Sequence, residues 1–141
     1  MQLPQVIAHL SSVLHLPQMK QDEHGASGFR VHGIDIWLAP CPAPASAFIV
    51  RASLGQVDVP DFAPLLDSLV RANFFADGVG GPVFGIDARA QVFLTQHFDE
   101  GSFSLASMDG WLSRFVAQAQ AGQELLAQAR AAASAAEGVT P

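Results

Sequence analysis

The hydrophobic residues near the start of the chain follow a helical period. They recur at the i, i+3, i+4 and i+7 spacing of one helical face, and Pro4 stands where a first turn tolerates proline. The residues of this face are Leu3, Val6, Ile7, Leu10, Val13 and Leu14. Pro17 ends the pattern, and the polar stretch 18–27 indicates a loop. We therefore expect a short amphipathic helix followed by a connection.

A period of two replaces the helical period near residue 28. Apolar and polar residues alternate on both sides of Gly33, but the parity of the apolar positions changes at this glycine. Such a change predicts a tight turn or a bulge, because a shift by one residue turns every side chain to the other face. A third alternating run follows a proline-rich connection. The expected strands span 28–32, 34–39 and 47–54, and their closeness in sequence favours an antiparallel meander.

The clearest helical stripe in the chain begins after Pro60. Asp61 is a good candidate for the helix cap, and a glycine-rich turn at 78–82 ends the helix. The apolar members of the stripe are Phe62, Leu65, Leu66, Leu69, Val70 and Phe74. We expect a helix over 61–74 with a wide apolar face.

Two strands and a long helix complete the pattern. The strands are expected at 83–87 and 91–98, and the helix begins near Ser107. The alanine-rich tail at 131–141 has little to bury, so we expect it to fray. The order α-β-β-β-α-β-β-α predicts a single α+β domain over 1–137, with an antiparallel sheet packed against helices.

Composition and charge exclude two classes of partner. Of the 141 residues, 50% are hydrophobic and only 14% are charged, whereas a soluble domain carries about 25% charged residues. Seven Lys and Arg against 13 Asp and Glu give a formal net charge of −6. Nucleic acid requires clustered basic residues, but Lys20 is the only lysine and the arginines are scattered. No apolar run is long enough to span a membrane, so we expect neither nucleic-acid nor membrane binding.

The single cysteine, Cys41, indicates a reducing compartment. It cannot form a disulfide within the chain, and the first residues lack the basic start of a signal peptide. We therefore expect a cytoplasmic protein.

Catalytic and cofactor-binding patterns are not visible in the sequence. The glycine-rich run 78–85 leads from a helix into a strand, which is the reverse of the order that a phosphate loop requires. The five histidines have no metal-ligand spacing, and no base accompanies Cys41. We expect no catalytic residue, no metal, no cofactor and no enzymatic activity.

The apolar stripes leave two interpretations open. In one, all of them belong to the core of a single chain, as most apolar stripes do. In the other, one helix pairs with its own copy in a dimer and another helix offers an apolar groove to a partner. The helix over 61–74, with Phe75 beside its stripe, favours a contact beyond the core.

Four stretches then give the chain a resemblance to a known family. They combine a leucine-rich helix ending near an asparagine, a glycine-rich turn, a strand pair, and a final helix with a Phe-Val pair. They are Leu65-Leu66 through Ala72-Asn73-Phe74, Gly80 through Asp87, Gln91 through Leu94, and Trp111 through Val116. In these stretches and in its order of elements, the chain resembles the class I type III secretion chaperones, the Tir-chaperone (CesT-like) family.

The resemblance implies a homodimeric bacterial chaperone that works without ATP. Such a protein would bind the N-terminal chaperone-binding segment of a secreted effector and keep it extended and secretion-competent. The implied effector contacts lie on the first helix and the sheet, at Val6, Ile7, Leu10, Val13, Phe29, Val31, Ile34 and Ile36. The implied dimer interface lies on the middle helix and the adjoining strand, at Leu65, Leu66, Leu69, Phe74 and Val83. The secretion ATPase is a further candidate partner.

A second class of function stays open on the residues alone. It is a small α+β ligand-binding or enzymatic domain with a pocket between sheet and helix. The oligomeric state separates the two hypotheses, because the chaperone hypothesis requires a dimer. The net charge of −6 would also suit an effector with basic stretches, mainly by steering its approach.

Overall fold

The computed structural model describes residues 2–16, 21–41, 47–57, 63–74, 81–102 and 104–138. The helices are α1 (Leu3–Val13), α2 (Ala63–Phe74) and α3 (Leu105–Gly138), and a 3-10 turn, η1 (Glu100–Ser102), precedes α3. The strands are β1 (Ser27–Val31), β2 (Ile34–Pro40), β3 (Ala47–Gln56), β4 (Val83–Ile86) and β5 (Gln91–Asp99). The predicted α+β class and order of elements are confirmed.

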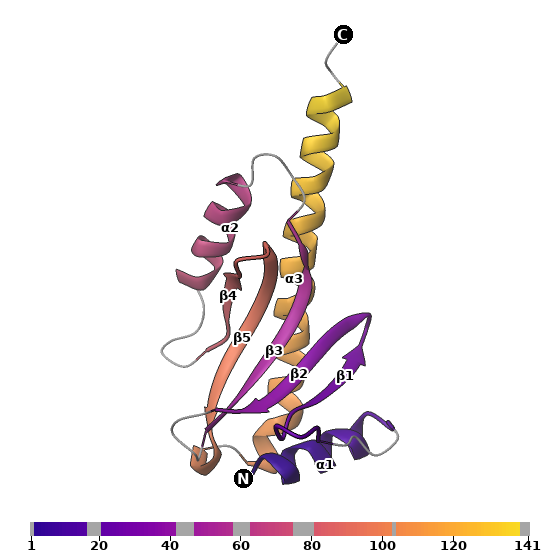
Figure 1. The fold of residues 1–141 in the computed structure, drawn as a ribbon, viewed down its shortest axis with the longest axis vertical. Helices are drawn as coiled ribbons and strands as arrows, with labels where there is room; N and C mark the ends of the chain where they lie inside the picture. The colour runs from indigo at the N-terminus through magenta and orange to yellow at the C-terminus, as the bar shows by residue number, and fades with distance from the viewer. Residues whose placement is uncertain are drawn as a thin grey trace.

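The strands form one antiparallel sheet in the order β1-β2-β3-β5-β4 (Figure 1). The first three strands make the expected meander. The longest ladder joins two strands that lie far apart in the sequence, because β5 pairs with β3 from Ala47 to Gln56. This pairing leaves β4 and β1 as the two edge strands.

The parity change at Gly33 is a two-residue hairpin turn. Val31 pairs with Ile34, and the two residues between them, His32 and Gly33, have φ values of 51° and 76°. Two successive positive φ values are typical of a type I′ turn, whose twist matches that of the flanking strands. The turn places Val31 and Ile34 opposite each other, which explains why the apolar parity shifts.

The core lies between one face of the sheet and the helices. Alternate residues of β2, β3 and the first half of β5 point to this face and are buried, and α3 packs along it (Figure 1). The largest buried side chains include Phe48, Ile36, Leu38 and Leu94 of the sheet, Phe115, Met108 and Leu126 of α3, and Leu10 of α1. The Trp111 ring contacts the rings of Phe98 and Phe115 where α3 begins to cross the sheet.

Helix α3 is longer than the sequence predicts. It begins at Leu105 and continues to Gly138, so that its last turns extend past the sheet (Figure 1). The tail beyond Arg130, whose fraying stays a prediction, is helical to Gly138. Arg130 itself donates a hydrogen bond from its guanidinium to the Gln56 carbonyl at 2.7 Å. Alanine also has the highest intrinsic helix propensity, which favours the helix even where its side chains bury little.

A glycine in the middle of α3 permits close packing against β4. A Cβ atom on Gly122 would lie 2.5 Å from the Phe84 ring and 2.7 Å from a Leu54 methyl group. Both neighbours are side chains of the sheet, Leu54 within the core and Phe84 packed against it. Gly122 therefore lets the helix approach the sheet more closely than any other residue would.

We expect Gly122→Ala to lower the free energy of unfolding. Overpacking costs about 1–3 kcal/mol, which outweighs the gain of about 1 kcal/mol in helix propensity. Gly110→Ala is the matched control on the same helix, because its Cβ would meet only the flexible end of Arg114, at 3.2 Å. Urea denaturation should show a loss for the first variant and a gain of up to about 1 kcal/mol for the second. Equal stabilisation by both would contradict the packing described here.

Candidate functional site

The edge of β1 offers unpaired backbone groups. In an antiparallel ladder, hydrogen-bonded and non-hydrogen-bonded pairs alternate, and the two residues that flank a two-residue turn form a hydrogen-bonded pair. Because Val31 pairs with Ile34, the backbone groups of Arg30 and Gly28 point away from β2. Both residues are exposed, and no strand of the described chain pairs with this side of β1. We refer to these backbone groups as the β1 edge.

A hollow of mixed polar and apolar lining lies beside the β1 edge, where the hairpin meets α3. It has a volume of about 260 Å³ and is lined by Val31 and His32 of the hairpin and by five residues of α3. The α3 residues are Leu112, Ser113, Val116, Ala117 and Gln120. A polypeptide that added to the β1 edge would point every second side chain toward this hollow, because side chains alternate along a strand.

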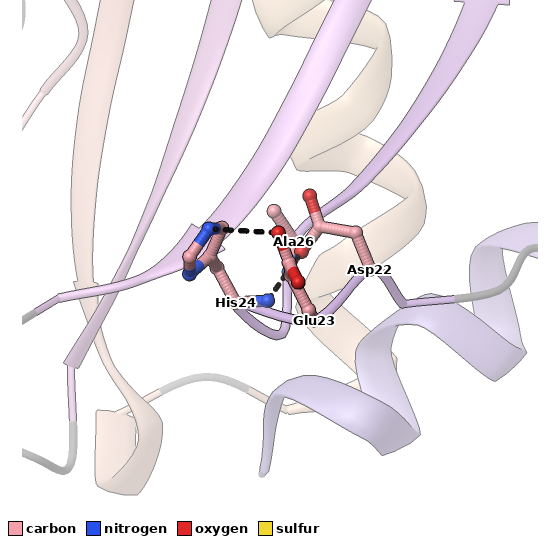
Figure 2. Close-up of polar contacts among 4 residues, drawn as sticks. All are labelled: Asp22, Glu23, His24 and Ala26. Atoms are coloured by element: carbon pink, nitrogen blue, oxygen red, sulfur yellow. Dashed lines mark hydrogen bonds and ion pairs between the residues drawn. The ribbon is translucent and has the colours of Figure 1, made fainter.

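A tight loop before β1 fixes where the edge strand begins. The Asp22 carboxylate accepts hydrogen bonds from the backbone N–H groups of His24, at 2.8 Å, and Ala26, at 2.9 Å. The Asp22 N–H donates to the Ala26 carbonyl at 2.7 Å. Figure 2 shows Asp22, Glu23, His24 and Ala26 together in this loop. Mainly because Ala26 donates to the carboxylate, the pKa of Asp22 lies below its ordinary value. The His24 N–H adds to this effect, while desolvation opposes it.

The lowered pKa of Asp22 predicts a pH-dependent contribution to stability. A carboxyl whose pKa is lower in the folded chain stabilises the fold above its ordinary pKa, and this contribution is lost as the pH falls through the folded value. We expect Asp22→Ala to have a lower Tm than the wild type near neutral pH. The difference should shrink on acidification from about pH 6 to about pH 3, as followed by circular dichroism. A difference that stays constant over this range would show that the carboxylate charge does not matter.

The opposite edge of the sheet is closed by a side chain. Asn73, at the end of α2, donates from its amide nitrogen to the Phe84 carbonyl at 2.9 Å and accepts from the Phe84 N–H at 2.6 Å. Its amide thus pairs with the two outward backbone groups of this residue as a neighbouring strand would. The β4 edge is therefore occupied at its middle, whereas the β1 edge is open.

An exposed apolar face joins α2 to β4. Val70 is 62% exposed, Val83 47% and Leu66 37%. These three residues are the α2–β4 face. Leu65 and Leu69, which the resemblance also implies for the dimer interface, are only 3% exposed and pack into the core of their own chain. The side chain of Phe74 lies outside the described residues. Of the predicted dimer-interface residues, Leu66 and Val83 are therefore exposed in the single chain, whereas Leu65 and Leu69 are not.

Most of the implied effector-contact residues are core residues in the single chain. Val6, Ile7, Leu10, Ile34 and Ile36 are buried, because the face of α1 that carries the stripe and the helix-facing side of β2 pack into the core. Val13 is 40% exposed, and Phe29 and Val31 are half-buried. The last two lie on β1 itself. The accessible part of the predicted set therefore lies on and near the edge strand.

Sequence reasoning missed the residues that shape these surfaces from other elements. Leu112 and Val116 of α3 line the hollow, and Asn73 closes the β4 edge. The asparagine had a signal, because a polar residue on an otherwise apolar stripe needs a hydrogen-bond partner when it is partly buried. The sequence also offered a signal for Trp37, which is 49% exposed. It alternates with Ile36 and Leu38 and so lies on the face of β2 that carries the polar residues.

The described ranges contain neither a cluster of metal ligands nor a membrane-spanning helix. No three His, Cys, Asp or Glu residues there lie close enough to hold a metal ion together. None of the helices in those ranges has both the length and the apolar character that a bilayer crossing requires.

Comparison with known families decides the identity. The sequence model of the Tir chaperone protein (CesT) family matches residues 5–123, which include every strand and most of α3. The chain belongs to the CesT family. The resemblance in its sequence is thereby confirmed, and the family match ends before the last turns of α3, which continue to Gly138.

Solved structures show the same fold as this CesT-family chain. A chain of the ExsC–ExsE complex superposes with a TM-score of 0.71 at 20% identity, covering 89% of this chain and 97% of that one. A chain from the complex of the Yersinia pestis type III secretion chaperone SycH with a stable fragment of YscM2 has a TM-score of 0.64 at 17% identity, with coverages of 84% and 97%. A chain of the ExoT–SpcS complex of Pseudomonas aeruginosa has a TM-score of 0.57 at 21% identity, covering 85% of this chain and 97% of that one. No curated protein sequence matches this chain.

Proposed function

We propose that this CesT-family chain is a homodimeric, cytoplasmic chaperone of a type III secretion system. In this proposal it binds the N-terminal chaperone-binding segment of an effector and keeps it extended, without ATP. The observation that carries the proposal is the open β1 edge beside a hollow that Val31, Leu112 and Val116 help to line, in a chain of a chaperone family. One structural neighbour, SycH, is a type III secretion chaperone in complex with a stable fragment of YscM2, which supports the proposal.

The β1 edge suits an unfolded client for a physical reason. Backbone N–H and C=O groups pair with any extended polypeptide, whatever its sequence, and the hollow accepts alternate apolar side chains. A client that orders on binding loses conformational entropy, so it must cover a large surface to bind well. The proposed contacts are therefore the backbone of Gly28 and Arg30, the half-buried Phe29 and Val31, and the exposed Val13.

The proposed dimer uses the α2–β4 face. Exposed apolar residues on neighbouring elements are typical of an interface between two copies, and a two-fold axis would place the same face of each copy against the other. The buried Leu65 and Leu69 would then support this face from within the chain. The contact with the secretion ATPase stays a prediction.

The alternative function, a ligand-binding or enzymatic domain, places its pocket between sheet and helix. In the described chain that layer contains Val50, Leu94 and Phe115, all at most 1% exposed. Side chains packed in this way leave no room for a substrate at those positions. The hollows beside β1 and on the other face of the sheet are open surfaces, and they fit a polypeptide better than an enclosed substrate.

The proposal is tested with the effector that co-purifies with the chain from its own cells. Its N-terminal segment, fused to an unrelated folded protein, is expected to be captured by the purified chain without ATP. The effector that lacks this segment should not be captured. Light scattering of the complex should give two chains per segment. Capture of the effector without its segment, or capture that requires ATP, would contradict the proposal.

A further inference from the structure

The face of the sheet that points away from the core carries a second hollow. It has a volume of about 640 Å³, and its walls belong to β1, β2, β3 and β5, which lie side by side. We define the outer-face hollow by Gly28, Asp35, Trp37, Arg51, Ser53 and Phe93. Register places Trp37 between Gly28 of β1 and Arg51 of β3, and Ser53 between Asp35 of β2 and Phe93 of β5.

An exposed tryptophan gives the hollow an apolar wall. Trp37 is 49% exposed, although its ring partly covers Gly28, where a Cβ would lie 3.3 Å from a ring carbon. A large aromatic ring that stays half in water presents a flat surface to an apolar side chain, and tryptophan is enriched where proteins bind each other.

Arg51 supplies the hollow with a positive charge that forms no ion pair with the described acidic residues. Its guanidinium lies over the Phe93 ring, 5.1 Å from the centroid, and its Nε donates to the Thr95 hydroxyl at 3.3 Å. None of the ion pairs among the described residues involves Arg51. The ring and the hydroxyl hold the guanidinium in place while its terminal nitrogens remain available for a carboxylate.

The carboxylate within the hollow is already paired elsewhere. Asp35 accepts from Nε of Arg30 at 2.8 Å and from a terminal nitrogen at 3.3 Å, in a two-point contact across the hairpin. The negative charge of Asp35 is therefore neutralised by Arg30, whereas the positive charge of Arg51 is not. In a chain with a net charge of −6, this leaves one apolar hollow with a local preference for a negative partner.

We propose that Arg51 is a specificity-determining residue, which selects client segments that carry an acidic side chain next to an apolar one. The apolar side chain packs against Trp37, and the acidic side chain forms a two-point hydrogen bond with Arg51. This inference rests on the proposed chaperone function, because it concerns which polypeptides the chain accepts. Pairing of a fixed guanidinium with a carboxylate adds selectivity, since a basic side chain at that position would be repelled.

Selection from a random peptide library displayed on phage tests the inference. Phage that also bind the Trp37→Ala variant are removed, so that the remaining peptides depend on the outer-face hollow. Peptides selected on the wild-type chain should be enriched in Asp or Glu beside an apolar residue. Selection on Arg51→Glu should enrich Lys or Arg instead. Arg89→Glu, in the turn between β4 and β5, makes the same charge change outside the hollow and should select as the wild type does.

The affinity of one selected acidic peptide gives the second measurement. By calorimetry, Arg51→Ala should weaken binding about tenfold or more, because a hydrogen bond to a charged group is worth about 1.5–3 kcal/mol. Each of three outcomes would overturn the inference. Peptides selected on the wild-type chain could lack acidic enrichment, peptides selected on Arg51→Glu could show the same acidic enrichment, or no selected peptide could depend on Trp37. Both variants should still capture the effector's N-terminal segment at the β1 edge if the chaperone proposal holds. If the wild-type chain itself does not capture the segment, the proposed function is overturned instead.

Discussion

Val70→Asp is expected to give a folded monomer in place of the proposed wild-type dimer. Val70 is 62% exposed in the single chain, so a charge there costs the fold of one copy little. In a two-fold dimer each copy would bury its own unpaired carboxylate in an apolar interface, at a cost of several kcal/mol. We expect the dimer dissociation constant to rise by roughly a thousandfold or more, which corresponds to about 4 kcal/mol. Light scattering over a range of concentrations measures it.

Two further variants make the dimer experiment decisive. Val13→Asp introduces the same change at an exposed valine of α1, and it should leave the dimer intact. Leu69→Asp is expected to unfold or aggregate the chain, because Leu69 belongs to the core of its own copy. A Val70→Asp chain that stays dimeric, or a wild-type chain that is monomeric at tens of micromolar, would contradict the proposed interface.

Arg30→Pro is expected to abolish capture of the effector segment while the chain stays folded and dimeric. The N–H of Arg30 points away from β2, so proline removes a group that only an added strand would use. Edge strands tolerate proline on their outward side, whereas an added strand would lose a hydrogen bond and meet the proline ring. We expect the affinity for the segment to fall about a hundredfold or more, as measured by calorimetry.

Arg30→Ala is the matched control for the edge. It removes the ion pair with Asp35, which is exposed on both sides and contributes little, but it keeps the backbone N–H. Its affinity for the segment should stay within a few-fold of the wild type. Equal losses in both variants would show that the arginine side chain matters and the backbone edge does not.

The period of the apolar residues was sufficient to predict the helices and strands, but not which strands pair with each other in the sheet. The alternating runs and the parity change at Gly33 predict β1 and β2 nearly residue by residue, because a two-residue turn leaves a visible mark in the pattern. The pairing of β3 with β5 has no such mark. It joins residues 35 to 52 positions apart, such as Arg51 and Thr95, and it alone decides that β4 lies at an edge.

The same limit applies to the candidate surfaces. A stripe on α2 tells which residues are apolar, but not which of them the chain's own α3 covers. Leu65 and Leu69 face inward, and Leu66 and Val70 face outward, although all four belong to one stripe. The apolar face of α1 is likewise buried in the single chain, and the period of its residues alone does not show this. The sequence shows that Arg51 is charged, but not what surrounds it. In the structure its guanidinium lies over the Phe93 ring, and it forms no ion pair with a carboxylate of the described residues.

One measurement tests the central claim directly, namely that the chain holds its client in an extended form. The effector's N-terminal segment, isotope-labelled and bound to the unlabelled chain, is examined by NMR, and the amides of the chain are followed with the labels reversed. We predict chemical shifts typical of a β-strand over the residues at the β1 edge, no tertiary contacts within the segment, and newly protected amides at Gly28 and Arg30 of the chain. A bound segment that folds into a globular unit of its own, or a β1 edge whose amides exchange as fast as in the free chain, would contradict this account.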